Sequence, residues 1–260
     1  MKAVILAGGY GSRISEESHL RPKPMVEIGG RPILWHIMKI FSAYGIDEFI
    51  ICCGYMQHVI KEYFANYYLY HSDITFDFKK GRGDMIVHSD HTEFWRVSVI
   101  DTGLDTMTGG RIKRIAPYLD DGPFLLTYGD GVSDVNISAL IDYHKKQGGL
   151  LTMTCVHPSI RFGNLNISDD GKVSSFREKS KDEPEWVNAG FMVVEKGMLD
   201  YLEDDTTVWE RDPIERCAAD GKMNAFRHNG FWQCMDTLRE KEMLERLWKS
   251  GKAPWKVWKD

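Results

Sequence analysis

The sequence has no long apolar segment. None of its 260 residues lies in a run that approaches the about 18 apolar residues needed to cross a bilayer. The N-terminus carries one lysine and few apolar residues before the first glycines, which is unlike a secretory signal. We therefore expect a cytoplasmic protein with no membrane span.

Cysteine is scarce, and its pattern excludes two common roles. The five cysteines form an odd set without a Cys-x-x-Cys pair, so neither a disulfide framework nor a zinc ribbon is indicated. Cys52 and Cys53 lie side by side in an apolar run. These thiols are typical of small core residues in a reducing compartment.

The chain also lacks a concentration of positive charge. Its net charge is −5, and lysine and arginine are scattered, so a nucleic-acid partner is not expected. With 43% hydrophobic residues, a chain of this length can bury a substantial core. We expect one domain over residues 1–260.

Glycine is concentrated where the first predicted strand ends. The apolar run 2–7 is followed by Gly-Gly-Tyr-Gly-Ser-Arg at residues 8–13, and glycines there allow backbone amides to approach a phosphate or a base edge. A dinucleotide fingerprint would need glycine at Ile14, which disfavours a dehydrogenase, and the lysine of a P-loop is absent. The loop predicts a phosphate site of another kind.

Two further stretches carry charges suited to that site. Lys23 lies between Pro22 and Pro24, which restrict its backbone to extended geometry and can hold its ammonium against a phosphate. Asp130 lies between two glycines at the end of the apolar run 124–128, where an α/β sheet presents ligand-binding groups.

Apolar runs alternate with amphipathic segments along most of the chain. Strand-like runs at 48–54 and 150–156 and helix-like segments at 33–44, 59–68 and 137–147 predict parallel βαβ units. Residues 72–101 break this rhythm, and we expect a β-hairpin excursion there. A helix is expected over 112–119, and residues 205–260 read as a mainly helical C-terminal part. The fold class is therefore α/β, with a mixed, mostly parallel sheet flanked by helices.

Taken in order, Gly-Gly-x-Gly-Ser-Arg, Pro-Lys-Pro-Met, Gly-Asp-Gly, Phe-Gly, Glu-Lys, Asn-Ala-Gly and Met-Asp-Thr resemble the signature of the sugar-1-phosphate nucleotidyltransferases. The resemblance implies their Rossmann-like fold and an attack by a sugar 1-phosphate on the α-phosphorus of a nucleoside triphosphate. Blocks such as Lys-Pro-Met-Val-Glu-Ile-Gly-Gly and Thr-Tyr-Gly-Asp-Gly imply CTP and glucose 1-phosphate as substrates. UTP or dTTP, and a catalytically silent nucleotide-sensing subunit of the same fold, remain alternatives.

The resemblance also implies roles for individual residues. Arg13 and Lys23 would be catalytic, and Asp130 and Asp236 would hold Mg²⁺. The nucleotide would contact Leu6, Ala7, Gly8, Gly9, Gly11, Ser12, Arg13, Lys23, Thr108, Gly109, Arg111, Tyr128 and Asp130. The sugar phosphate would contact Gly163, Glu178, Lys179 and Asn188.

The sequence also bears on base selection and on assembly. A guanidinium from Arg111 could pair with the acceptors of cytosine, with Gly109 and Gly110 allowing close approach; the alternative is a solvent-facing arginine early in a helix. The resemblance implies a homo-oligomer, with a hexamer as one option, and aromatic residues at 63–70 and 248–258 would suit its contacts. Tyr10, Arg21 and Ser180 depart from the expected pattern, which bears on loop shape and sugar fit.

Overall fold

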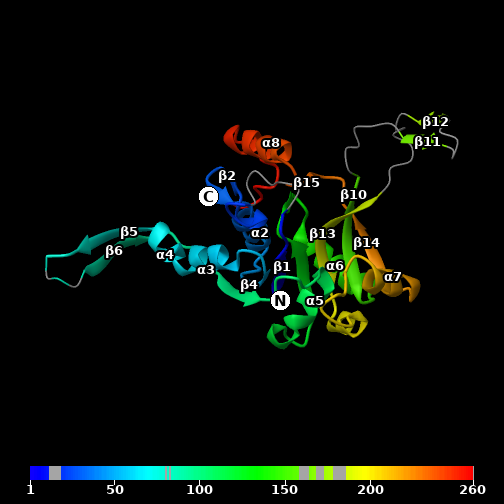
Figure 1. Cartoon of the computed structure of the whole chain (residues 1–260), viewed down its shortest axis with the longest axis horizontal. Helices are drawn as coiled ribbons and strands as arrows, with labels where there is room; N and C mark the ends of the chain where they lie inside the picture. The colour runs from blue at the N-terminus through cyan, green and yellow to red at the C-terminus, as the bar shows by residue number, and fades with distance from the viewer. Residues whose placement is uncertain are drawn as a thin grey trace.

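A computed structural model of the chain describes residues 1–11, 19–79, 81, 83–157, 164–167, 173–177 and 186–259 (Figure 1). Its centre is a seven-stranded sheet in the order β14-β10-β13-β8-β1-β4-β7. The strands are β1 (Ala3–Ala7), β4 (Glu48–Cys53), β7 (Arg96–Asp101), β8 (Phe124–Tyr128), β10 (Leu151–Val156), β13 (Val187–Val194) and β14 (Met223–Arg227). Only β13 is antiparallel to its neighbours among these strands, which confirms the mixed, mostly parallel sheet.

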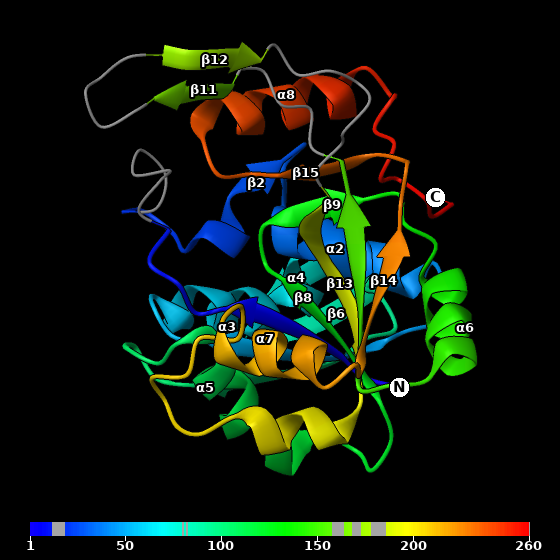
Figure 2. The same cartoon turned by 90° about the vertical axis from the view of Figure 1, so that its right-hand side faces the viewer.

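Helices cover both faces of this sheet (Figure 2). Successive residues of β1 alternate between two cores: Ile5 packs in one, and Val4 and Leu6 pack in the other. The first core includes residues of α2 (Ile33–Ser42), α6 (Ile137–Gln147) and α8 (Leu238–Lys249). The second includes residues of α5 (Thr108–Arg114), η4 (Lys196–Tyr201) and α7 (Asp212–Ala219). An all-apolar β1 follows from burial on both faces.

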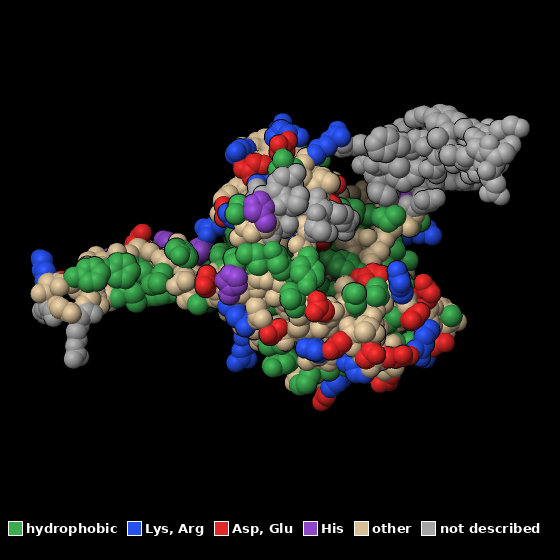
Figure 3. All heavy atoms as spheres, in the orientation of Figure 1, with side chains coloured by type: hydrophobic (Ala, Val, Ile, Leu, Met, Phe, Trp, Pro, Cys, Tyr) green, Lys and Arg blue, Asp and Glu red, His purple; other side chains and the backbone are tan. Residues whose placement is uncertain are grey.

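An arm projects from this body (Figure 1). It consists of the hairpin β5 (Ser72–Asp77) and β6 (Asp84–Asp90), which follows α3 (Gln57–Ala65) and α4 (Tyr67–Tyr70). The hairpin is shorter than the predicted range 72–101. Residues 96–101 form β7, which pairs in parallel with β4 at the edge of the main sheet. The arm exposes four large apolar residues, Phe76, Phe78, Met85 and Ile86, and Figure 3 shows hydrophobic side chains along its length.

Smaller elements complete the fold. Three two-stranded pairs join β2 (Glu27–Ile28) to β3 (Arg31–Pro32), β9 (Gly131–Ser133) to β15 (Trp232–Cys234), and β11 (Asn164–Ile167) to β12 (Val173–Arg177). Two 3₁₀ turns are η2 (Lys23–Met25) and η3 (Ala116–Tyr118). The helix expected over 112–119 instead begins at Thr108 and ends at Arg114, since Pro117 cannot continue it.

The cysteines lie in or beside the hydrophobic core, as the sequence predicted. Cys52, Cys53, Cys155 and Cys217 are buried, Cys234 is partly buried, and all five are free. Burial raises the pKa of each thiol, so the cysteines stay uncharged at neutral pH and can pack as small core residues. Within the described ranges, no helix is both long and apolar enough to cross a membrane.

The aromatic residues near the C-terminus surround a buried histidine of α2. Trp248, Trp255 and Trp258 pack around His36 within the same chain. The sequence had instead suggested that residues 248–258 contact another subunit. Trp255 donates its indole N–H to His36 Nδ1 at 3.3 Å, and His36 Nε2 lies 2.8 Å from the carbonyl of Ile28. These partners require the neutral tautomer with hydrogen on Nε2. Burial lowers the pKa of His36 to about 4.

We predict that acid destabilises the protein through His36. Because its folded pKa lies below the unfolded value of about 6.5, its stabilising contribution is present above that value and is lost as the pH falls toward 4. Between pH 7 and 5 the free energy of unfolding should fall by about 2 kcal/mol from this residue. Urea unfolding at both pH values should show a smaller loss in His36→Gln than in the exposed control His58→Gln. Equal losses in the two variants would contradict the prediction.

Candidate active site

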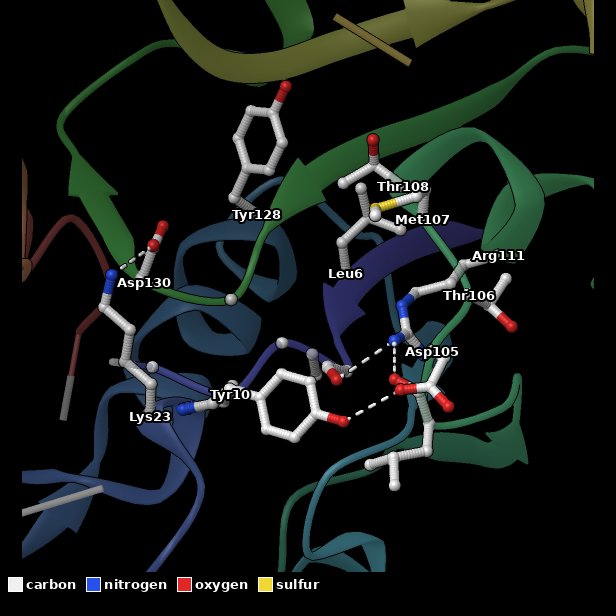
Figure 4. A pocket seen from close by; sticks show the side chains of 17 residues that line it. Leu6, Tyr10, Lys23, Asp105, Thr106, Met107, Thr108, Arg111, Tyr128 and Asp130 are labelled. Carbon is white, nitrogen blue, oxygen red and sulfur yellow. Dashed lines mark hydrogen bonds and ion pairs between the residues drawn. The ribbon is translucent and has the colours of Figure 1, made fainter. Parts of the chain in front are cut away.

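A cavity of about 520 Å³ opens where β1 and β8 end (Figure 4). It lies at the carboxyl ends of parallel strands, where α/β sheets bind ligands. Ten residues expected to contact a nucleotide line it: Leu6, Ala7, Gly8, Gly9, Gly11, Lys23, Thr108, Arg111, Tyr128 and Asp130. Gly109 does not line it, and Ser12 and Arg13 lie outside the described residues.

Lys23 connects two carboxylates at one end of the cavity. Its Nζ lies 2.6 Å from Asp130 Oδ2 and 2.5 Å from Asp236 Oδ1. Burial by itself disfavours the ammonium, but the charges and hydrogen bonds of the two aspartates outweigh burial and hold the pKa of Lys23 above its ordinary value. Lys23 is therefore a fixed cation at neutral pH and cannot act as a base.

Strand pairing brings the two aspartates together. Asp130 directly precedes β9, which pairs with β15 through Gly131 and Cys234, and the amide of Met235 donates to the carbonyl of Asp130 at 2.8 Å. The amide of Asp236 in turn donates to Glu240 at the capped start of α8. The start of α8 therefore holds one carboxylate, and β9 holds the other.

The two carboxylates can accommodate a divalent cation. Both reach a single ammonium nitrogen, so they already converge on one positive charge. Among the described residues, no cluster of three or more His, Cys, Asp or Glu could form a complete protein cage for a metal. Two carboxylates suit Mg²⁺, which commonly retains water and takes phosphate oxygens from a substrate.

Arg111 is almost fully buried, at 4% exposure, which excludes the solvent-facing alternative. Nη2 donates to the carbonyls of Gly8 and Leu104, and Nη1 to that of Gly103, at 2.7 to 3.2 Å. Nη1 also reaches the carbonyl of Cys53 and the hydroxyl of Thr102. Through Nη2, the guanidinium thus joins the two walls of the cavity, which are the glycine loop after β1 and the segment that follows β7.

Close protein packing or backbone conformation requires glycine at several of these positions. A Cβ at Gly8 would collide with the guanidinium of Arg111, whereas Gly11 has a positive φ of 65°. A Cβ at Gly109 would lie 2.8 Å from the carbonyl oxygen of Thr207. Gly109 and Gly110 therefore admit residues 202–210, which we call the strap, against the start of α5, and we had expected them to admit a base.

Sequence reasoning missed part of the cavity wall. The missed lining residues are Tyr10, Pro24, Leu104, Asp105, Thr106, Met107 and Gly129. Most of them follow β7, and the assignment of that strand to the hairpin concealed that its end also meets the site. Tyr10, noted only as a departure from the family pattern, donates to Asp105 at 3.0 Å between the two walls (Figure 4).

Only part of the expected sugar side is described. Asn188 on β13 donates from Nδ2 to the hydroxyl of Tyr128 at 3.1 Å, and its Oδ1 accepts from the amide of Gly190 at 2.8 Å. Asn188 therefore lies beside the cavity through Tyr128. Gly163, Glu178 and Lys179 lie outside the described residues.

Comparison with known proteins identifies close relatives. Residues 2–236 match the family model described as nucleotidyl transferase. The chain is 55% identical over 259 residues to glucose-1-phosphate cytidylyltransferase of Salmonella typhi, covering 99% of this chain and all of that protein. It is 42% identical over the same length to a probable glucose-1-phosphate cytidylyltransferase of Bacillus subtilis. A probable mannose-1-phosphate guanylyltransferase of Oryza sativa is 28% identical, over 92% of this chain and 62% of that protein.

Solved structures share the fold at lower sequence identity. HddC from Yersinia pseudotuberculosis, complexed with GMP-PN, has a TM-score of 0.68 and 22% identity, covering 95% of this chain and 99% of that one. A UDP-glucose pyrophosphorylase complexed with UDP-glucose has a TM-score of 0.67 and 14% identity, covering 96% and 98%. At these identities the likeness shows the fold alone.

Proposed function

Because this chain belongs to the nucleotidyl transferase family, we propose that it transfers the cytidylyl group of CTP to glucose 1-phosphate, giving CDP-glucose and pyrophosphate. The observation that carries this proposal is the 55% identity over nearly the full chain to a glucose-1-phosphate cytidylyltransferase. The cavity supports it, since Lys23, Asp130 and Asp236 converge at its edge.

The reaction needs positioning and charge neutralisation more than acid–base catalysis. An oxygen of the sugar phosphate attacks the α-phosphorus, and the bond from that phosphorus to the bridging oxygen of pyrophosphate breaks. The nucleophile is largely ionised at neutral pH, because the second pKa of a phosphate monoester is about 6. In this proposal the ammonium of Lys23 stabilises the charge that develops at the α-phosphate, and Arg13 holds the departing phosphates.

We assign Asp130 and Asp236 to Mg²⁺. When bound, the cation would supply charge neutralisation for the phosphates and help to orient them. The two carboxylates hold the ammonium of Lys23 between them at 2.6 and 2.5 Å, so the same side chains place the lysine and would receive the metal. This shared use explains why both acids lie next to the proposed catalytic cation.

The buried charge of Arg111 supports an anionic ligand. Its hydrogen-bond partners are neutral, and within the described ranges no carboxylate lies at ion-pair distance from it. The guanidinium therefore contributes positive potential beside Gly8, which would favour a phosphate of the nucleotide there. The sugar side would be formed by Asn188 together with Gly163, Glu178 and Lys179.

A nucleotide panel tests this function directly. Pyrophosphate release is measured with glucose 1-phosphate and CTP, UTP or dTTP in turn, with and without Mg²⁺. We expect turnover with CTP to exceed the others by about 10²-fold or more, because a mismatched base leaves buried polar groups unpaired. A preference for UTP or dTTP would change the base assignment, and the absence of turnover with every nucleotide would favour a silent sensing subunit.

We predict that Arg111→Lys lowers kcat/KM for CTP and for UTP by similar factors. The guanidinium holds the carbonyls of Gly8 and Leu104 in opposite walls, so its loss should loosen the cavity for every nucleotide. A lysine has one nitrogen in place of the forked group and cannot restore both links. The measurement is the ratio of kcat/KM for the two nucleotides in wild type and variant. If the CTP-to-UTP ratio falls by the same factor as kcat/KM for CTP, so that kcat/KM for UTP is unchanged, Arg111 instead pairs directly with cytosine.

We also propose a cytoplasmic homo-oligomer, with a hexamer as one option. The free cysteines support a reducing compartment. The apolar surface of the arm, which includes Phe76 and Phe78, supports contact with another copy of the chain. Analytical ultracentrifugation of the purified protein tests the assembly, and a monomer at micromolar concentration would exclude it.

A further inference from the structure

We propose that Glu210, which does not line the cavity, is a positioning residue that holds Thr108 and Tyr128, which do line it, in register. This inference deepens the proposed function and rests on it. Glu210 was not among the residues singled out from the sequence. It lies at the end of the strap, directly after the fully buried Trp209.

The carboxylate of Glu210 bridges two residues that do line the cavity. Oε1 accepts from the hydroxyl of Tyr128, at the end of β8, at 2.7 Å. Oε2 accepts from the hydroxyl of Thr108, at the start of α5, also at 2.7 Å. In Figure 4 both hydroxyls point toward the same side of the cavity. One acid therefore links the last residue of a central strand to the first residue of a helix.

An ionised carboxylate also determines the direction of every hydrogen bond in this group. It can only accept, so Tyr128 and Thr108 must both donate to it. The phenol oxygen is then an acceptor for Asn188 Nδ2 at 3.1 Å, and the threonine oxygen is an acceptor for the amide of Trp209 at 2.9 Å. Burial, followed by the charge and hydrogen bond of Glu210, raises the pKa of Tyr128 and keeps it a donor.

The hydrogen bonds of Tyr128 continue to Asn188, on the expected sugar side of the cavity. Its Oδ1 accepts from the amide of Gly190, and its Nδ2 donates to Tyr128, so the two ends of the amide are distinguished. The amide of Gly190 fixes Oδ1 of Asn188, and Glu210, by taking the hydrogen of the Tyr128 hydroxyl, leaves the phenol oxygen as the acceptor for Nδ2. Glu210 thus supports the contact between Asn188 and Tyr128 beside the cavity.

A role confined to anchoring the strap is less consistent with the contacts. Carbonyls of the strap already accept from the start of α5: that of Asp205 from the amide of Met107, and that of Thr207 from the amides of Gly109 and Gly110. Asp205 also pairs with Arg114 through two hydrogen bonds of 2.8 and 2.5 Å. These bonds hold the strap without Glu210, whose exposed carboxylate can be changed without opening the core.

The test is Glu210→Gln, with Glu203→Gln as the matched control. Both are exposed glutamates of the strap, and the Glu203 carboxylate pairs with Arg216, which does not line the cavity. A glutamine offers one acceptor and one donor group, so it cannot receive both hydroxyls. We expect KM for glucose 1-phosphate and for CTP to rise about tenfold, the factor for one lost charged hydrogen bond, with a smaller change in kcat and an unchanged Tm.

Epistasis separates positioning from anchoring. In a Tyr128→Phe/Thr108→Val background, the carboxylate has neither partner, so adding Glu210→Gln should have no further effect on KM. An effect equal to that in the wild-type background, or a Glu210→Gln variant with the KM values of Glu203→Gln, would overturn the proposal. Inactive wild type would instead contradict the proposed function, and equilibrium CTP affinity of the same variants would then decide the role of Glu210.

Discussion

Replacing Lys23 with alanine should lower kcat/KM for CTP by about 10² to 10³, the usual cost of losing one electrostatic contact to developing charge. Lys23 is the cation between Asp130 and Asp236, and the aspartates hold it in the charged state. Without it, two carboxylates face the substrate phosphates at one end of the cavity. Steady-state kinetics of pyrophosphate release gives the measurement.

A second lysine provides the control for this experiment. Lys39 is also partly buried and pairs with a carboxylate, that of Glu93, at 2.8 Å, but it does not line the cavity. Lys39→Ala should therefore retain most activity even if it lowers Tm. Near-normal turnover in Lys23→Ala would remove this lysine from the mechanism. Between pH 7 and 9 the wild-type rate should show no titration of Lys23, since its pKa lies above the ordinary value.

Asparagine at Asp130 or at Asp236 should lower kcat/KM by about 10² and raise the Mg²⁺ concentration needed for half-maximal rate. The amide keeps the shape of the carboxylate but loses the charge that balances the metal. Because both acids converge on one point, the double variant should be far more active than the product of the single effects indicates. Metal titrations of the single and double variants provide the test.

The charge-matched control is Asp142→Asn, on the exposed surface of α6. Its Mg²⁺ dependence should equal that of the wild type. Two single effects that simply multiply in the double variant would mean that Asp130 and Asp236 do not share an ion. A double variant no worse than either single variant is the expected limit for a fully shared site.

Part of this site could be predicted from short sequence patterns with strong backbone preferences. The apolar run 2–7 and the glycines after it predicted a strand that ends in a ligand site, and ten of the expected nucleotide contacts line the cavity. Pro22 and Pro24 predicted an extended backbone at Lys23, which is wrong, because Lys23 begins the 3₁₀ turn η2 and only Pro22 is extended; the side chain of Lys23 is nevertheless buried at the cavity. Such features depend on a few adjacent residues whose backbone preferences are strong.

Errors arose where the partner of a segment lies far away in sequence. Residues 96–101 looked like another hairpin strand, yet they pair with β4, and the wall that follows them was missed. A short strand carries no local mark of the neighbour with which it pairs. Gly109 and Gly110 looked ready for a base, but the strap occupies the space beside them.

The sequence by itself therefore determined the α/β class and the glycine loop at the end of β1, and it singled out Lys23 and, through family resemblance, the other residues of the proposed site. Tertiary structure decided which charges meet: Lys23 and Asp236 are 213 positions apart, and the pairing of β9 with β15 brings the aspartate to the lysine. It also revealed Glu210, which no local pattern marks, between Thr108 and Tyr128. The physical reason is range, because backbone preferences act over a few residues, whereas hydrogen-bond partners depend on how distant segments pack.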